Sequence, residues 1–217
     1  MIPEPEKDCP LCPRLVAFRE AQRAQAPDWF NGAVPSFGPE SARLLIVGLA
    51  PGLGGANRTG RPFTGDWAGD LLYACLETHG FSLGTYGRHA EDGLRLTDAM
   101  ITNAVRCVPP QNKPVAAEIN TCRPYLRDRI ATLPKLTTLL CLGRVAHEST
   151  VRALGGRPAH HPFAHGAEQM MDGPTRPLTL VSSFHCSRYN TNTGRLTPEM
   201  FDAILARCRA LVGPVAV

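Results

Sequence analysis

Lysine is almost absent from this chain, although the chain is mildly basic. Of the 23 basic side chains in its 217 residues, only Lys7, Lys113 and Lys135 are lysines, and the formal net charge is +4. Arginine pairs with phosphate through two N–H groups and stacks on bases, so an arginine-rich surface suits a nucleic acid. A GC-rich genome also favours arginine codons, so this composition supports a nucleic-acid partner without establishing one.

Several common sequence signals are missing, and each absence argues against a class of protein. No apolar run approaches the roughly 18 residues of a membrane-spanning helix, so no membrane partner is expected. The opening segment MIPEPEKDCP holds no apolar stretch, so we expect a cytoplasmic protein without a secretory signal. Neither a Walker-type phosphate loop nor a Gly-x-Gly-x-x-Gly turn is present, which argues against a nucleotide phosphate cradle.

The cysteines do not fit a disulfide framework, because no secretory signal accompanies them. Cys9 and Cys12 form a Cys-x-x-Cys pair, and Cys107 and Cys122 form a wider pair near prolines. Four thiolates from two distant segments can hold zinc or an iron–sulfur cluster, and this spacing does not choose between them. The alternative is four unrelated free thiols.

The segment from Leu44 to Asp66 has the most informative pattern in the chain. An apolar run ends at Gly48, and a loop rich in glycine and proline follows it, with Phe63 and Asp66 near its end. Glycine lets a backbone approach a ligand closely, and such a loop after a strand is the usual place of a binding site in an α/β fold. Many loops of this kind are only turns, so the pattern favours a ligand site without requiring one.

Apolar runs alternate with helical periodicity along the chain, which is typical of an α/β fold. We expect strands at 44–47, 99–105, 136–142 and 178–182, and helices at 13–25, 67–79, 114–130, 143–154 and 197–211. This order predicts a single domain, residues 1–217, with a central four-stranded, mainly parallel sheet flanked by helices on both faces. The helix at 114–130 is expected to bend or break at Pro124.

In such a sheet, the loops after the first, second and fourth strands leave from one edge. They carry residues 48–66, 106–114 and 183–195. Because ligands bind at the carboxyl ends of parallel strands, we expect these three loops to form one site.

Four motifs in these loops resemble those of the uracil-DNA glycosylase superfamily. They are Gly48-Leu-Ala-Pro-Gly52, Gly60-Arg-Pro-Phe-Thr-Gly-Asp66, Arg106-Cys-Val-Pro-Pro-Gln-Asn-Lys-Pro114 and Ser183-Phe-His-Cys-Ser-Arg188. Each motif is loose alone, but the four in order, with four cysteines at matching places, are specific. The match is closest to family 5, also called type b. Family 4 has an acidic residue where this chain has Leu49, whereas family 5 has the aspartate at the place of Asp66.

The resemblance implies a site for excising a damaged base from DNA. Asp66 would stabilise the cationic sugar and orient water, and His185 would donate a hydrogen bond to the departing base. Phe63 would stack on the base, with Gly48, Ala50 and Gly52 beside it. Either Asn103 or Asn112 would read the base. Phe63 and His185 also fit ordinary core roles.

The resemblance also implies a DNA-binding surface and a cofactor. Arg58, Arg61, Arg188 and Arg195 would face phosphates, and the loop of Arg188, Tyr189 and Asn190 would enter the duplex where the flipped base leaves a gap. Alternatively, the last three form an ordinary polar loop. The four cysteines Cys9, Cys12, Cys107 and Cys122 would hold a structural [4Fe–4S] cluster. The segment containing His160, His161 and His165 is expected to face DNA rather than bind a metal, because Pro162 breaks its helical spacing.

The expected activity is therefore a monomeric, monofunctional DNA glycosylase that removes uracil and other deaminated or damaged bases by hydrolysis. Cutting the backbone through a Schiff base needs an amine, and Lys113 is the single candidate near the site. Two alternatives are a non-catalytic module that binds damaged nucleic acid and a hydrolase of free nucleosides.

Overall fold

The computed structural model describes residues 4–214 and has a central five-stranded sheet. The strands follow the order β4-β1-β5-β7-β6. Four are parallel, and β6 pairs with β7 in the antiparallel direction. Their bounds are β1 (Leu44–Gly48), β4 (Ala99–Asn103), β5 (Thr138–Leu142), β6 (Glu168–Asp172) and β7 (Pro177–Ser183).

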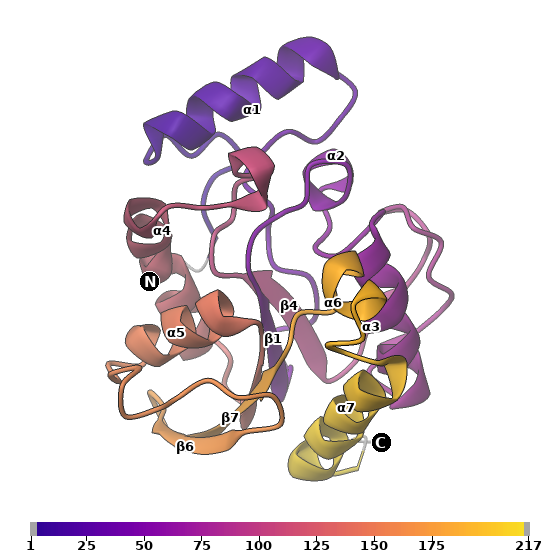
Figure 1. The fold of residues 1–217 in the computed structure, drawn as a ribbon, viewed down its shortest axis with the longest axis vertical. Coiled ribbons are helices and arrows are strands. Elements are labelled where there is room, and N and C mark those ends of the chain that lie inside the picture. Colours follow the sequence, from indigo (N-terminus) through magenta and orange to yellow (C-terminus); the bar gives the residue numbers. More distant parts are fainter. Residues whose placement is uncertain (1–3, 215–217) are drawn as a thin grey trace.

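Helices cover both faces of this sheet, as predicted (Figure 1). Alternate side chains of β1 point to opposite faces, so Leu44 and Ile46 pack with one helix pair, and Leu45 and Val47 with the other. The first pair is α3 (Trp67–Thr78) and α7 (Pro198–Val212), and the second is α4 (Ala116–Ala131) and α5 (Arg144–Ala153). Burial on both faces explains the nearly continuous apolar sequence of the strand.

The sheet differs from the prediction in having five strands instead of four. The fifth, β6, reads Glu-Gln-Met-Met-Asp and buries only Met171. An edge strand with one buried side chain lacks the apolar run by which a central strand is recognised. Of the two alternatives predicted at Pro124, the break is excluded because α4 continues through this residue from Ala116 to Ala131; a bend there stays a prediction.

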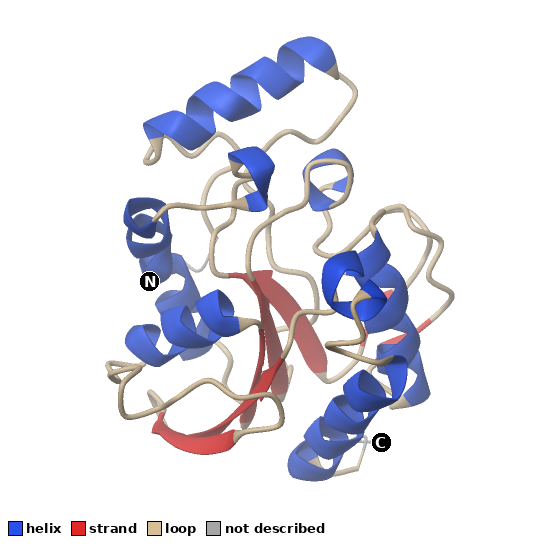
Figure 2. Cartoon of the chain, viewed as in Figure 1, coloured by secondary structure: helices blue, strands red, loops and turns tan. Residues whose placement is uncertain are grey.

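The remaining elements are short and lie outside the central sheet (Figure 2). They are α2 (Ala56–Thr59), the 3-10 helix η1 (Pro110–Asn112), α6 (Arg188–Asn192) and the hairpin of β2 (Ser82–Leu83) with β3 (Arg95–Leu96). The helix α1 (Pro13–Gln25) lies beyond the end of the sheet, above α2 in Figure 1. Within the described residues, no helix is both long and apolar enough to cross a membrane.

The parallel register brings the ends of neighbouring strands together. Gly48 at the end of β1 lies opposite Asn103 at the end of β4, and Leu142 of β5 lies opposite Ser183 of β7. The loops that follow these four strands therefore leave from one edge of the sheet, as predicted from the strand order.

Candidate active site at the carboxyl edge of the sheet

A cavity of about 530 Å³ lies at this edge of the sheet. Loops after β1, β4, β5 and β7 all contribute to its wall. Nine of the predicted site residues line it: Ala50, Gly52, Phe63, Asp66, Asn103, Asn112, His185, Arg188 and Tyr189. Residues more than 130 positions apart in the sequence thus share one cavity, and its volume is typical of a small-molecule site.

Asp66 is the N-cap of α3 and presents its carboxylate to the glycine-rich loop. Its Oδ1 accepts the N–H of Gly69 at 3.1 Å. A methyl group built on Gly55 would lie 2.3 Å from Oδ2, so the carboxylate packs directly against this backbone. Burial raises the pKa of Asp66, and the helix N–H groups of Gly69 and Ala68 oppose that shift. One oxygen thus caps the helix and the other lies beside the loop that lines the cavity.

Phe63 and His185 form a stacked pair on the cavity wall. Their ring centroids are 5.7 Å apart and their planes differ by 24°. Burial lowers the pKa of His185 to about 4, so its imidazole is neutral at pH 7. Its Nδ1 has no hydrogen-bond partner among the described residues. A buried ring nitrogen without a partner is unusual in a folded protein and indicates a place for a ligand atom.

Asn103 lines the same cavity and carries a second buried polar atom without a partner in residues 4–214. Its side chain is buried, and its Oδ1 lacks a partner within the described part of the chain. A methyl group on Gly48 would lie 2.4 Å from this oxygen and 2.7 Å from the ring of Phe63. There is therefore no room for a side chain at position 48. Because Gly48 has none, the side chains of Asn103 and Phe63 can both pack against its backbone.

Asn112 reaches the cavity from a different direction. It ends η1 in a left-handed conformation with a φ of 55°, and its side chain is exposed. The neighbouring Gln111 has a φ of 56°. Asparagine tolerates this backbone region better than most residues. The geometry brings both asparagines to the cavity and leaves open which of them reads a base.

The structure corrects the prediction that Arg61 faces phosphate. Its side chain is buried, and its guanidinium makes two hydrogen bonds to Asp92, of 2.7 Å and 2.6 Å. The Nε atom donates to Thr64 at 2.7 Å, and the guanidinium also lies over the rings of Tyr73 and Tyr86. All of these partners lie inside the protein, so the guanidinium of Arg61 is not available to contact DNA.

Tyr86 holds the same loop in place, and the sequence analysis did not identify it. Its hydroxyl accepts the N–H of Gly65 and donates to the carbonyl of Phe63, both at 3.1 Å. Phe63 has a left-handed φ of 53°, which is unfavourable for a bulky residue. The bonds from Tyr86 therefore help to maintain a strained conformation beneath the cavity.

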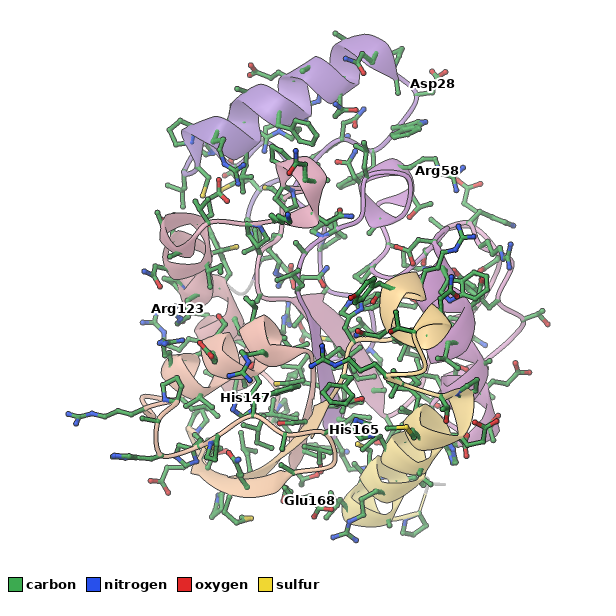
Figure 3. All side chains as sticks on the ribbon, in the orientation of Figure 1. Asp28, Arg58, Arg123, His147, His165 and Glu168 are labelled. Carbon is green, nitrogen blue, oxygen red and sulfur yellow. The ribbon has the colours of Figure 1, made fainter. Side chains whose placement is uncertain are left out.

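Of the predicted DNA contacts, Arg188 and Tyr189 lie in the short helix α6, which the sequence analysis treated as a loop. Ser187 caps this helix by accepting the N–H of Asn190. Arg188 is exposed, and Tyr189 is 73% exposed although it also lines the cavity. Arg58, labelled in Figure 3, is exposed at α2. All three can reach a partner outside the protein.

Asn190 and Arg195 make internal contacts instead of lining the cavity. The Nδ2 of Asn190 donates to the carbonyl of His185 at 2.8 Å, which supports the segment that carries this histidine. The guanidinium of Arg195 lies 4.5 Å from the ring centroid of Phe184 and is exposed.

The histidine-rich loop before β6 contacts the core. The ring of His165 stacks on Phe184, and its Nδ1 accepts the N–H of that residue at 3.2 Å. His147 of α5 hydrogen-bonds through its two ring nitrogens to Ser182 and to the carbonyl of His161. Figure 3 labels His147 and His165 at this place. His160 is exposed in the same loop.

The four predicted cysteine ligands come together away from the main cavity. Cys9, Cys12, Cys107 and Cys122 line a small pocket of about 20 Å³ beside α1. They belong to an apolar cluster that also contains Ala50 of the glycine-rich loop. The pocket is therefore separated from the main cavity by the loop itself.

The surroundings of these cysteines suit a negatively charged group. The buried Arg19 places Nη1 3.8 Å from the sulfur of Cys107, and the N–H of Arg106 points to the sulfur of Cys122 at 3.3 Å. Burial raises the pKa of Cys107 to about 12 and that of Cys122 to about 11. Within residues 4–214, no three His, Cys, Asp or Glu side chains are grouped so that they could hold a metal ion. The metal ligands therefore remain a prediction.

Other cavity residues escaped the sequence analysis. Trp67 follows Asp66 directly, and Arg144 and Val145 are the first residues of α5, just after β5. This strand was predicted, and its carboxyl end lies at the same edge as the others. The position of the strand was therefore a usable signal for Arg144 and Val145, which begin the helix that follows it.

Fold and site together define an α/β protein with a cavity that combines one carboxylate, a stacked aromatic pair and an arginine at its mouth. The family model described as "Uracil DNA glycosylase superfamily" matches residues 35–209. A type-5 uracil-DNA glycosylase of Thermus thermophilus is 44% identical, over 94% of this chain and 94% of that protein. The chain belongs to the uracil DNA glycosylase superfamily and, within it, to the type-5 group.

Two further relatives, both from Pyrobaculum aerophilum, allow the similarity of this chain to type 5 and to type 4 to be compared. Its type-5 uracil-DNA glycosylase is 36% identical, over 95% of this chain and 90% of that protein. Its type-4 uracil-DNA glycosylase is 33% identical, but over 70% of this chain and 63% of that protein. The preference for family 5 over family 4, argued above from Leu49 and Asp66, is confirmed.

Proposed function

We propose that this protein is a monofunctional DNA glycosylase that hydrolyses the N-glycosidic bond of uracil in DNA and so begins base excision repair. The main observation behind this proposal is a pair of buried polar atoms without partners in the described chain, on two residues that line the same cavity as Asp66. The Oδ1 of Asn103 and the Nδ1 of His185 are buried without partners in the described structure. Both residues line the cavity, so the polar edge of a flipped base would lie against their side chains. One copy of the chain supplies every group of the cavity, so a single domain acting as a monomer suffices.

Asp66 and His185 carry the bond-breaking step in this proposal. The target nucleotide is flipped out of the duplex, because the glycosidic bond is hidden inside it. As the bond breaks, positive charge develops on the sugar and negative charge on the base. The carboxylate of Asp66 stabilises the sugar cation and orients the attacking water. The neutral imidazole of His185 donates to the base oxygen, and one such positioned donor contributes on the order of 3 kcal/mol.

In this proposal, Phe63 and one of two asparagines select the base. Stacking of a base on an aromatic ring is worth about 1–3 kcal/mol. An amide side chain offers a donor and an acceptor to the edge of a base. The buried Asn103 and the exposed Asn112 are both candidates for this pairing, with Ala50 and Gly52 lining the pocket beside them.

Binding to duplex DNA uses the exposed groups around the cavity mouth. Arg58, Arg188 and Arg195 face phosphates in this proposal, and Tyr189 with Asn190 occupies the gap left by the flipped base. Among the described residues no lysine lines the cavity, and Lys113 near it is exposed. The reaction therefore ends at an abasic site.

The test is excision from duplexes that each carry one lesion, followed by alkaline cleavage of abasic sites. A duplex with a single uracil opposite guanine should release uracil, and hypoxanthine, xanthine and cytosine adducts define the range. Release from free deoxyuridine would indicate a nucleoside hydrolase instead. Binding without release would indicate a recognition module. The Asp66→Asn variant retains a good helix cap and should lose at least about a hundredfold in single-turnover excision.

For the cysteine pocket we propose a [4Fe–4S] cluster held by Cys9, Cys12, Cys107 and Cys122. Two observations support it: the convergence of the four thiols on one pocket, and the buried cation of Arg19 beside Cys107. When bound, the cluster supplies a rigid anchor between the segment before α1 and the loop after β4. None of the four thiols lines the main cavity, so its role is structural.

Visible absorption near 400 nm, roughly as expected for a thiolate-bound cluster, would support this assignment. Cys107→Ala should lose the absorption and part of the iron. Cys141→Ala is the matched control, because Cys141 is also buried but lies in a different apolar cluster, where it hydrogen-bonds to Thr150. Colourless protein with stoichiometric zinc would refute the cluster and keep the ligands.

A further inference from the structure

Trp67 is a large aromatic residue that the reaction described above does not use. It is the first residue of α3 and directly follows Asp66. Its side chain lines the main cavity and is 51% exposed. Tyr189 of α6 also lines this cavity and is 73% exposed. Two aromatic faces left open at the mouth of one cavity need an explanation other than core packing.

The indole of Trp67 is held in a defined orientation. Its Nε1 donates to the hydroxyl of Thr191 in α6 at 3.1 Å. The guanidinium of Arg188 lies 5.7 Å from its ring centroid. Both contacts connect the start of α3 to α6, which lie next to each other in Figure 1. An exposed side chain with two such contacts is positioned in advance of binding.

The environment of the ring matches a nucleic acid better than a protein partner. Aromatic rings beside cationic groups are the usual surface on which nucleotides stack, since the ring takes the base and the cation takes the phosphate. Arg188 is exposed and can reach a phosphate from its place over Trp67. The catalytic carboxylate lies one residue away in the chain.

We propose that Trp67 contacts the strand that carries the lesion, by stacking on a nucleotide at the mouth of the cavity. This inference rests on the proposed function, because it takes duplex DNA with one flipped nucleotide as the ligand. It adds a substrate-contacting residue beyond the four motifs. The opposing view is that Trp67 only anchors α6 through Thr191.

Fluorescence tests the contact directly, because the chain has only two tryptophans, Trp29 and Trp67. In the Trp29→Phe variant all tryptophan emission comes from Trp67. The ligand is a duplex with 2′-fluoro-deoxyuridine opposite guanine, since the fluorine opposes formation of the sugar cation and keeps the base attached. The reference ligand is the same duplex with cytosine.

We expect the lesion duplex to quench Trp67 emission clearly more than the reference duplex does. Trp67→Phe, which reports only Trp29, should show no such difference. The inference fails if labelled lesion duplex binds the Trp29→Phe variant, as seen by anisotropy, while the emission stays unchanged. It also fails if both duplexes change the emission equally.

Three variants separate stacking from anchoring. Thr191→Val removes the acceptor of the indole N–H and keeps the ring, whereas Trp67→Ala removes the ring. Under our inference Trp67→Ala weakens binding of the lesion duplex about tenfold or more, while Trp67→Phe and Thr191→Val stay within about threefold of wild type. Equal losses in Trp67→Ala and Thr191→Val would show anchoring alone. Uracil excision by the wild type is measured separately, so a silent Trp67 in an active enzyme refutes only this inference.

Discussion

Gly55 offers a way to displace the carboxylate of Asp66 without altering it. A methyl group on Gly55 would lie 2.3 Å from Oδ2 and 2.9 Å from Cγ of Asp66, whereas ordinary contact begins at 3.4 Å. In Gly55→Ala the carboxylate must therefore withdraw by about 1 Å, and a displacement of this size can cost a hundredfold in rate.

The neighbouring glycine supplies a matched control. A methyl group on Gly54 meets no atom within 4 Å, so Gly54→Ala places the same group in open space. We expect Gly55→Ala to lose about a hundredfold in single-turnover excision of uracil and Gly54→Ala to lose less than about twofold. Both variants should bind the duplex with 2′-fluoro-deoxyuridine, because the three closest atoms to the new methyl group all belong to the side chain of Asp66.

A thermal melt of both variants accompanies the assay. The cap that Asp66 provides to α3 is worth about 1 kcal/mol, so even its complete loss leaves a folded protein. If Gly55→Ala excises uracil as fast as Gly54→Ala, the position of the Asp66 carboxylate does not limit the reaction. The water would then have to be oriented by another group.

Three further predictions follow from burial and charge. Asp92→Asn leaves the buried Arg61 without its counter-charge, which should cost about 3 kcal/mol and lower the melting temperature by roughly 10 °C. Since Arg61 lowers the pKa of Asp92, the stability from this pair is present at neutral pH and lost as pH falls below about 4. Excision should fall with decreasing pH as the Asp66 carboxylate is protonated, at a midpoint above that of an ordinary aspartate because burial raises its pKa, while burial lowers the pKa of His185 to about 4. Arg188→Ala should weaken binding to all duplexes and reduce the salt slope by about one unit.

Two of these predictions have a control variant on the same chain. Glu148→Gln breaks an exposed pair within α5 and should change the melting temperature little. An excision rate that rises as pH falls would instead indicate a protonated His185 as the donor. Arg176 precedes β7 at the opposite edge of the sheet, so Arg176→Ala should leave the salt slope unchanged. An unchanged slope in Arg188→Ala would place α6 away from the DNA.

The sequence was sufficient for the parts of the fold that are buried on a regular period. The apolar run of β1 and the helical spacing of α3 identify central elements, because burial on both faces leaves little choice of residue. The edge strand β6 and the helix α6 were missed for the opposite reason. Polar residues on an exposed surface are compatible with many backbone conformations. The N-cap at Ser187 is only a weak signal for a helix in so short a segment.

Arg61 shows where sequence reasoning about a site fails. Its motif sits among residues that line the cavity. Nothing in the motif reveals that both terminal nitrogens of its guanidinium donate to Asp92, which lies in a separate loop. Exposure and ion pairing are tertiary properties. The same limit applies to Tyr86, whose two hydrogen bonds to the motif come from a segment without any recognisable pattern.

The two asparagines illustrate how burial refines a question that the sequence leaves open. Asn103 is fixed at the end of β4, and its unsatisfied oxygen was desolvated when the protein folded. A buried acceptor without a partner costs free energy that a base can return on binding. Asn112 is exposed and keeps its water in the free protein, so it gains less from pairing with a base. Burial therefore favours Asn103 over Asn112 as the residue whose pairing would discriminate between bases.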